Sequence, residues 1–133
     1  MEAPQQAPEK QGLAITAEAL YMLNLLFPVL PLFALGVIYF RHRNDPSLFV
    51  RSHVIQPWIA ALISTALFFL INLIAALAGG YTSLDNLISI HSLVALEVYT
   101  LLVILPFLVP GLLALTRAMS GQAWRYPLIG RFL

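Results

Sequence analysis

Three long apolar stretches alternate with short polar segments along this chain of 133 residues. They cover about residues 18–40, 54–78 and 86–116. A helix rises about 1.5 Å per residue, so each stretch is long enough to cross a hydrocarbon core of about 30 Å. The pattern predicts an all-α membrane protein with three transmembrane helices.

Prolines and turn residues indicate where these helices bend, begin and end. We expect proline kinks at Pro28, Pro31, Pro57, Pro106 and Pro110. Asp45 followed by Pro46 predicts a helix start, because Asp is a good capping residue and proline suits the first helical position. Gly79 and Gly80 are expected to end the second helix.

The third apolar stretch permits two interpretations. From Leu84 to Thr116 it is longer than the roughly 20 residues that one crossing needs. Residues 84–92 either form an interfacial segment before the crossing or belong to one long helix that starts near Asp85. The lack of a turn signal between the two parts favours the single helix.

Composition supports a membrane location. Hydrophobic residues make up 60% of the chain and charged residues 10%, against roughly 25% charged in soluble domains. So small a protein cannot bury that much apolar surface internally. Residues 1–17 begin with proline, glutamine and charge, which predicts a disordered tail before one helical domain at 18–133.

The arginines predict an orientation. Three lie in the loop between the first two stretches, and three lie between Arg117 and Arg131. Cytoplasmic loops are rich in Lys and Arg, so we expect the N-terminus outside and the C-terminus in the cytoplasm. This describes a multi-pass protein of the bacterial inner (plasma) membrane. The aromatic and basic residues of 122–133 predict a tail in the headgroup region.

Polar residues inside or beside the apolar stretches are the candidate sites. Glu97 is an acid well inside such a stretch, which is a functional candidate by default. Three readings are open: a structural bond to Asn24, Tyr21 or Tyr99, a contact with a partner, or ion handling. The candidate intramembrane polar or partner contacts are Glu97, Asn24, Asn72, His53 and His91. The candidate lipid or partner contacts are Arg41, Arg43, Arg51, Trp124, Arg125, Tyr126 and Arg131.

Several classes of function find no support in the sequence. Without cysteine the chain has neither disulfides nor thiolate ligands. His53 and His91 are expected at opposite membrane faces, so we expect no metal and no cofactor. No catalytic motif or nucleophile–base pair is evident, which indicates a protein that is not an enzyme. Six arginines in two short segments do not indicate nucleic-acid binding.

Two segments resemble a known family. After Pro31-Leu32, residues 43–53 (Arg-Asn-Asp-Pro-Ser-Leu-Phe-Val-Arg-Ser-His) are similar to the loop of small bacterial membrane proteins of unknown function. That family is related to the channel-like component of the chloroplast inner-envelope translocon (Tic). Residues 118–133, with Arg125-Tyr-Pro-Leu, resemble the family's C-terminus. The resemblance covers about residues 28–133 and implies the same fold and membrane location, without catalytic residues.

Together these observations predict a non-enzymatic integral membrane protein. We expect an accessory, scaffolding or assembly subunit of a larger membrane complex, in contact with membrane lipids. The alternative is a homo-oligomeric transport or channel component similar to the translocon relatives. The identity of the partner or cargo and the oligomeric state stay open.

Overall fold

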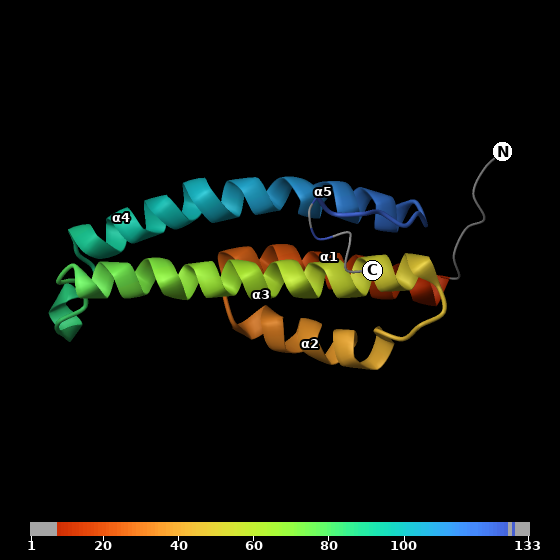
Figure 1. Cartoon of the computed structure of the whole chain (residues 1–133), viewed down its shortest axis with the longest axis horizontal. Helices are drawn as coiled ribbons and strands as arrows, with labels where there is room; N and C mark the ends of the chain where they lie inside the picture. The colour runs from red at the N-terminus through yellow and green to blue at the C-terminus, as the bar shows by residue number, and fades with distance from the viewer. Residues whose placement is uncertain (1–7, 128, 130–133) are drawn as a thin grey trace.

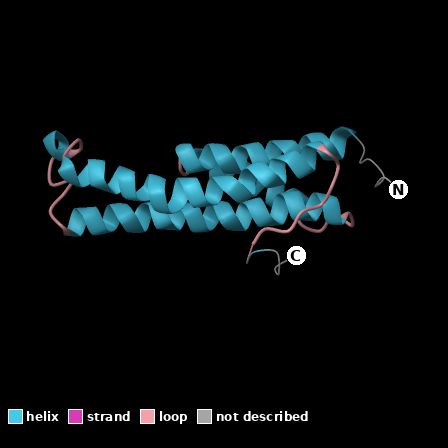
Figure 2. Cartoon of the chain, turned by 90° about the horizontal axis from the view of Figure 1, so that it is seen from above, coloured by secondary structure: helices cyan, strands magenta, loops and turns pink. Residues whose placement is uncertain are grey.

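The computed structural model describes residues 8–127 and residue 129. The helices are α1 (Pro8–Leu26), α2 (Leu30–His42), α3 (Leu48–Leu77), α4 (Ile90–Tyr99) and α5 (Leu105–Met119), with a short 3-10 turn η1 (Leu84–Asn86) and a π-helical turn η2 (Thr100–Ile104). These residues contain no strand (Figure 2). The prediction of an all-α protein is confirmed.

Two long antiparallel helices form the frame of the molecule (Figure 1). One is α3, which runs through Pro57 without interruption. The other joins α4, η2 and α5 into a continuous helix from Ile90 to Met119. Each has 30 residues and is long and apolar enough to cross a membrane. The second begins at Ile90 rather than near Asp85, because residues 84–86 form the separate turn η1.

The single proline-kinked helix expected over residues 18–40 is instead a hairpin of two helices, α1 and α2. The chain reverses at Pro28 and Val29, where Val29 adopts a positive φ of 90°. Proline lacks the N–H that would continue the helix. Asn24 stabilises the reversal, because its Oδ1 accepts a hydrogen bond from the Val29 N–H at 3.1 Å. The expectation of a simple kink is therefore wrong.

The α1–α2 hairpin begins and ends at the same end of the molecule (Figure 1). Lys10 near the start of α1 lies 4.0 Å from Asp45 in the loop after α2. We expected the N-terminus and this loop on opposite membrane faces. The start of α1 and the loop instead lie together at one end of the molecule. Residues 8–17, expected to be disordered, are helical.

The hairpin reaches only about half the length of α3. Near its tip the Asn24 amide donates to Thr65 Oγ1 at 2.9 Å, and Tyr99 O–H donates to the Leu25 carbonyl at 2.8 Å. Beyond this level only α3 and α4 continue toward the Gly79–Ser89 connection (Figure 1). One half of the molecule therefore contains four helical segments side by side, and the other half contains two.

Close packing of small residues holds the hairpin against the long helices. A Cβ at Gly36 would lie 3.0 Å from the Trp58 ring, and one at Gly111 would lie 2.7 Å from Tyr21 Cε1. Trp58 also stacks on Tyr39, with ring centroids 5.4 Å apart. Such close approach lets helix backbones pack tightly where water exclusion supplies little driving force.

The start of α3 differs slightly from the expected one. Ser47, rather than Asp45, is the capping residue, and its Oγ accepts from the Val50 N–H at 3.4 Å. Asp45 Oδ1 instead accepts from the Ser47 N–H at 2.8 Å, which fixes the turn before the helix. The capping role therefore shifts by two residues, and the helix begins at Leu48.

Candidate functional site

A fully buried pair of ionisable side chains joins α1 to α3. His53 Nδ1 lies 2.9 Å from Glu18 Oε1, and neither side chain is exposed. His53 is in the second turn of α3, near the end of the bundle that carries Arg41, Arg43 and Arg51, which we name the arginine-rich end. Such a pair is stable away from water only when the remaining polar atoms also find partners.

Those partners come from the segment that follows α5, residues 122–127, which we name the C-terminal strap. His53 Nε2 lies 2.8 Å from the Gln122 carbonyl, and the Tyr126 hydroxyl bonds the second carboxylate oxygen of Glu18. Burial, together with the neighbouring Glu18 carboxylate, raises the pKa of Tyr126 well above its ordinary value. The hydroxyl therefore keeps its proton and donates a hydrogen bond to Glu18.

Gln56, one turn beyond His53 on α3, holds the same strap through its side-chain amide. Its Nε2 donates to the Trp124 carbonyl at 2.6 Å, and its Oε1 accepts from the Tyr126 N–H at 2.6 Å. A second donation to the Ser52 carbonyl, at 3.0 Å, completes the bonding of the amide. Gln56 therefore bonds the backbone groups on either side of Arg125, one carbonyl and one N–H, much as a neighbouring β-strand would.

The network has no polar atom left over for a substrate. Both carboxyl oxygens of Glu18, both ring nitrogens of His53 and both ends of the Gln56 amide take part in hydrogen bonds. Buried polar groups that are fully bonded stabilise and specify a fold. We therefore regard this cluster as the site that fixes the C-terminal strap.

Most of the predicted arginine contacts gather around this end. Arg41 and Arg43 are exposed, and the guanidinium of Arg43 lies 5.4 Å from the centre of the Phe40 ring. Arg51 donates to the carbonyls of Asp45 and Pro46 at 3.0 and 3.3 Å. Arg125 is exposed on the strap. Arg131 lies outside the described residues.

The strap's aromatic side chains differ from the expectation of lipid or partner contacts. Tyr126 is only 3% exposed, and its ring packs edge-on against Tyr21 with centroids 6.0 Å apart. The Trp124 ring lies beside Tyr126 at 5.2 Å and is half-buried. Tyr126 therefore makes internal contacts, and its buried hydroxyl donates a hydrogen bond to Glu18.

The two asparagines within the apolar helices are bonded inside the chain. Asn24 bridges Thr65 and the backbone of Val29, as described above. Asn72 donates to the Phe68 carbonyl at 2.8 Å and accepts from Tyr81 O–H at 2.7 Å. Both amides thus have internal hydrogen-bond partners, as buried polar groups require.

Glu97 differs from these residues. Its side chain is exposed on α4, and the described part of the chain offers it no hydrogen-bond or ionic partner. The side chains expected to bond it have other partners, since Tyr99 binds Leu25, Tyr21 donates to the Phe107 carbonyl and Asn24 bonds Thr65. Among the described residues, Glu97 therefore has no internal bond of the kind expected.

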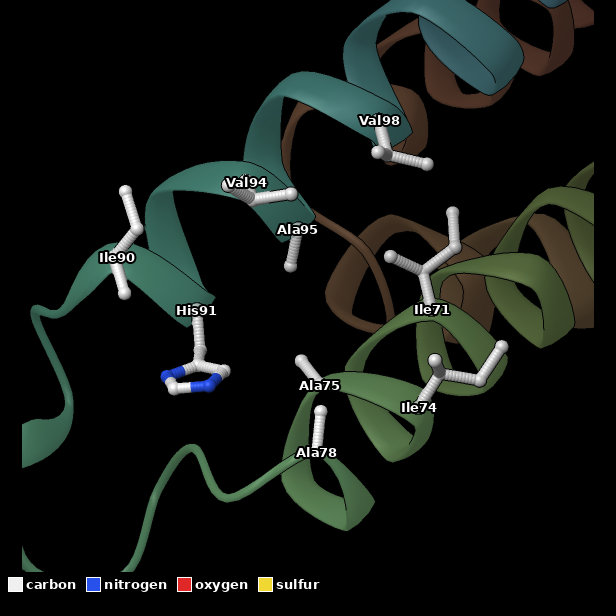
Figure 3. A pocket seen from close by; sticks show the side chains of 9 residues that line it. All are labelled: Ile71, Ile74, Ala75, Ala78, Ile90, His91, Val94, Ala95 and Val98. Atoms are coloured by element: carbon white, nitrogen blue, oxygen red, sulfur yellow. The ribbon is translucent and has the colours of Figure 1, made fainter.

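His91 lies far from His53, in an apolar groove between α3 and α4 (Figure 3). The groove has a volume of about 370 Å³ and is lined by Ile71, Ile74, Ala75, Ala78, Ile90, His91, Val94, Ala95 and Val98. Within residues 8–127 and 129, no group of three or more His, Asp or Glu side chains could hold a metal ion.

The sequence does not identify two residues of the buried cluster, Glu18 and Gln56, as site residues. Glu18 only marks the start of an apolar stretch, and Gln56 is only a polar interruption of another. A signal exists in the spacing of His53 and Gln56, which share one helix face three residues apart. It does not indicate the partner, because Glu18 lies 35 positions from His53 along the chain.

Comparisons with curated proteins and with solved structures found no match. A family model, that of the magnetosome magnetite crystal formation protein family (MamF/MmsF), matches residues 9–133. This match overturns the resemblance to the Tic-like, translocon-related family. The shared features were an arginine-bearing loop, a helix start and a basic aromatic terminus, which the topology of many small membrane proteins requires. The chain belongs to the MamF/MmsF family of magnetosome magnetite crystal formation proteins.

Proposed function

We propose that the protein is a non-enzymatic, multi-pass membrane protein that serves as an accessory or scaffolding subunit of a larger membrane complex. By its family, that complex acts where magnetite crystals form. The long helices α3 and α4–α5 cross the membrane, and the arginine-rich end lies in the cytoplasm. The membrane that it spans in this proposal is the bacterial inner (plasma) membrane.

The unpaired carboxylate of Glu97 carries this proposal. Glu97 is the eighth residue of α4, so it lies about 10 Å along the helix from Ile90. On its helix face Leu93 and Leu101 are 56% and 55% exposed, so the surroundings are apolar. An unpaired acid costs about 2.5–3.5 kcal/mol at the centre of a membrane helix on insertion scales, and Glu97, which lies nearer the end of its helix, carries a smaller penalty of the same kind. A polar or basic side chain of a partner helix would offset this penalty.

The buried cluster supports the non-enzymatic part of the proposal. Glu18, His53 and Tyr126 are the acid, base and hydroxyl that a catalytic site would need, yet each is bonded internally and sealed from solvent. A general base must reach the proton it abstracts. These three side chains instead hold the strap in place and build a fixed cytoplasmic surface.

Photo-crosslinking tests the subunit role. A benzophenone amino acid at Leu93 or Leu101 should crosslink to another protein in the native membrane, and the same probe at Phe33 on α2 is the matched control. Glu97→Gln should preserve the crosslink because the amide still forms hydrogen bonds, whereas Glu97→Leu should abolish it. Crosslinks to lipid alone, or equal yield in the Leu variant, would contradict the proposal.

The role in crystal formation needs its own test. Deleting the gene in the source strain should change the number or size of its magnetite crystals, and the wild-type gene should restore them. Electron microscopy of intact cells gives the measurement. Unchanged crystals, with the crosslinked complex intact, would place the subunit in another membrane process.

A further inference from the structure

The α1–α2 hairpin gives the molecule a different width in each half of the membrane. Its tip lies beside Thr65, near the middle of α3. Between the tip and the arginine-rich end, α1 and α2 pack beside α3 and α5, whereas beyond the tip only α3 and α4 continue (Figure 1). The transverse section therefore falls from four helices to two along the length of the bundle.

The apolar outer face of the hairpin places it within the hydrocarbon region. Leu30, Phe33, Val37 and Phe40 of α2 are 53–77% exposed, and Phe27 at the tip is 63% exposed. An apolar stripe of this kind is not stable against water. From Leu30 to Phe40 the helix rises about 15 Å, which is half of a hydrocarbon core of about 30 Å.

Aromatic residues mark the level at which the hairpin leaves the membrane. Tyr39 and Trp58 stack on each other near the end of α2, and such side chains prefer the headgroup level. From Trp58 to Leu77, α3 rises about 28 Å, again close to the hydrocarbon thickness. The hairpin therefore occupies the leaflet on the arginine-rich side, and its tip ends near the bilayer midplane.

Two additional helices in one leaflet enlarge the area that the protein occupies there. A helix with its side chains is about 10–12 Å wide, so the excess is on the order of 200 Å². A body that is broad in one leaflet and narrow in the other fits best where the broad side faces the convex surface. We infer that the protein prefers strongly curved membranes that are convex toward its arginine-rich end.

In the orientation proposed above, this preference selects buds and vesicles whose outer surface faces the cytoplasm. The inference rests on the shape of one chain and not on any partner. It can therefore fail while the subunit role holds, and it can hold when that role fails.

The test uses the purified full-length protein in phosphatidylcholine vesicles of about 40 to 300 nm in diameter. An Asn44→Cys variant, labelled with a membrane-impermeant dye, reports whether the arginine-rich end faces outward, because the chain has no other cysteine. Single-vesicle fluorescence then gives the number of molecules per lipid area for each orientation.

Molecules with the arginine-rich end outward should be enriched several-fold in the smallest vesicles, and molecules in the reverse orientation should be depleted there. The reverse orientation is the internal control, because an artefact of reconstitution would affect both orientations alike. Densities that do not depend on vesicle diameter, or enrichment of the reverse orientation, would overturn the inference.

Discussion

Glu18 Oε1 and His53 Nδ1 lie 2.9 Å apart, at hydrogen-bond distance, in a site from which solvent is excluded. His53 Nε2 must carry a hydrogen, because the Gln122 carbonyl can only accept one. The proton between Nδ1 and Oε1 then gives either an ion pair or two neutral groups. The pair has no net charge in either case, which allows it to remain buried.

A Glu18→Gln variant should fold with a change in stability within about 1 kcal/mol. The amide can donate to His53 Nδ1 and accept from Tyr126, so every hydrogen bond of the cluster survives with a neutral imidazole. Glu18→Leu removes both bonds and should lower stability by about 3–5 kcal/mol. Thermal unfolding in detergent, followed by circular dichroism, compares the two variants. Equal loss in both would show that the hydrogen bonds are unimportant.

Removing residues 122–133 should leave the helices and membrane insertion intact but weaken the bundle at its arginine-rich end. The deletion takes away the partners of His53 Nε2, of the Gln56 amide and of one Glu18 oxygen. We expect a lower unfolding temperature and faster amide exchange in α1, measured by hydrogen–deuterium exchange.

The matched control for the strap removes only residues 130–133, which leaves Gln122, Trp124 and Tyr126 in place. This shorter variant should behave as the wild type does. If both deletions change exchange in α1 equally, the bonds described for the strap do not account for its effect.

Single cysteines should report the hairpin topology, since the natural chain has none. Gly12→Cys at the start of α1 and Asn44→Cys in the loop after α2 are both exposed positions. An impermeant maleimide should label both from the cytoplasmic side, and Ser83→Cys from the opposite side only. Labelling of Gly12→Cys from the outside would restore the three-crossing arrangement and exclude the hairpin.

Gly111→Ala should destabilise the protein by about 1–3 kcal/mol, because overpacking displaces neighbouring side chains. The added Cβ would lie 2.7 Å from Tyr21 Cε1, and Tyr21 is fixed by its bond to the Phe107 carbonyl. Gly12→Ala is the control, since nothing lies within 4 Å of the added atom. That variant should gain up to about 1 kcal/mol from helix propensity. Unfolding temperatures that fall equally would contradict the packing argument.

The lengths of the apolar stretches predict the all-α architecture and the two long helices, because bilayer thickness constrains helix length directly. The hairpin could not be predicted in this way, since Pro28 is compatible with either a kink or a break. The hydrogen bonds of Asn24 favour the break over the kink, because its amide bonds both Thr65, 41 positions away, and the Val29 backbone. The buried cluster likewise depends on pairing across 108 positions, from Glu18 to Tyr126. No local pattern encodes such distances.

The hairpin also has a consequence for biogenesis. In the proposed arrangement α1 and α2 return to the side from which they enter, so that, among the described residues, 78–89 are the connection that must pass through the hydrocarbon core. That segment has one charged side chain, Asp85. Glu9 and Lys10, in the first turn of α1, stay on the side from which the hairpin enters in this arrangement. In that arrangement the two long helices can enter the bilayer together as one unit, and the barrier to insertion is the transfer of one short connection with a single acid, together with the Glu97 carboxylate on α4.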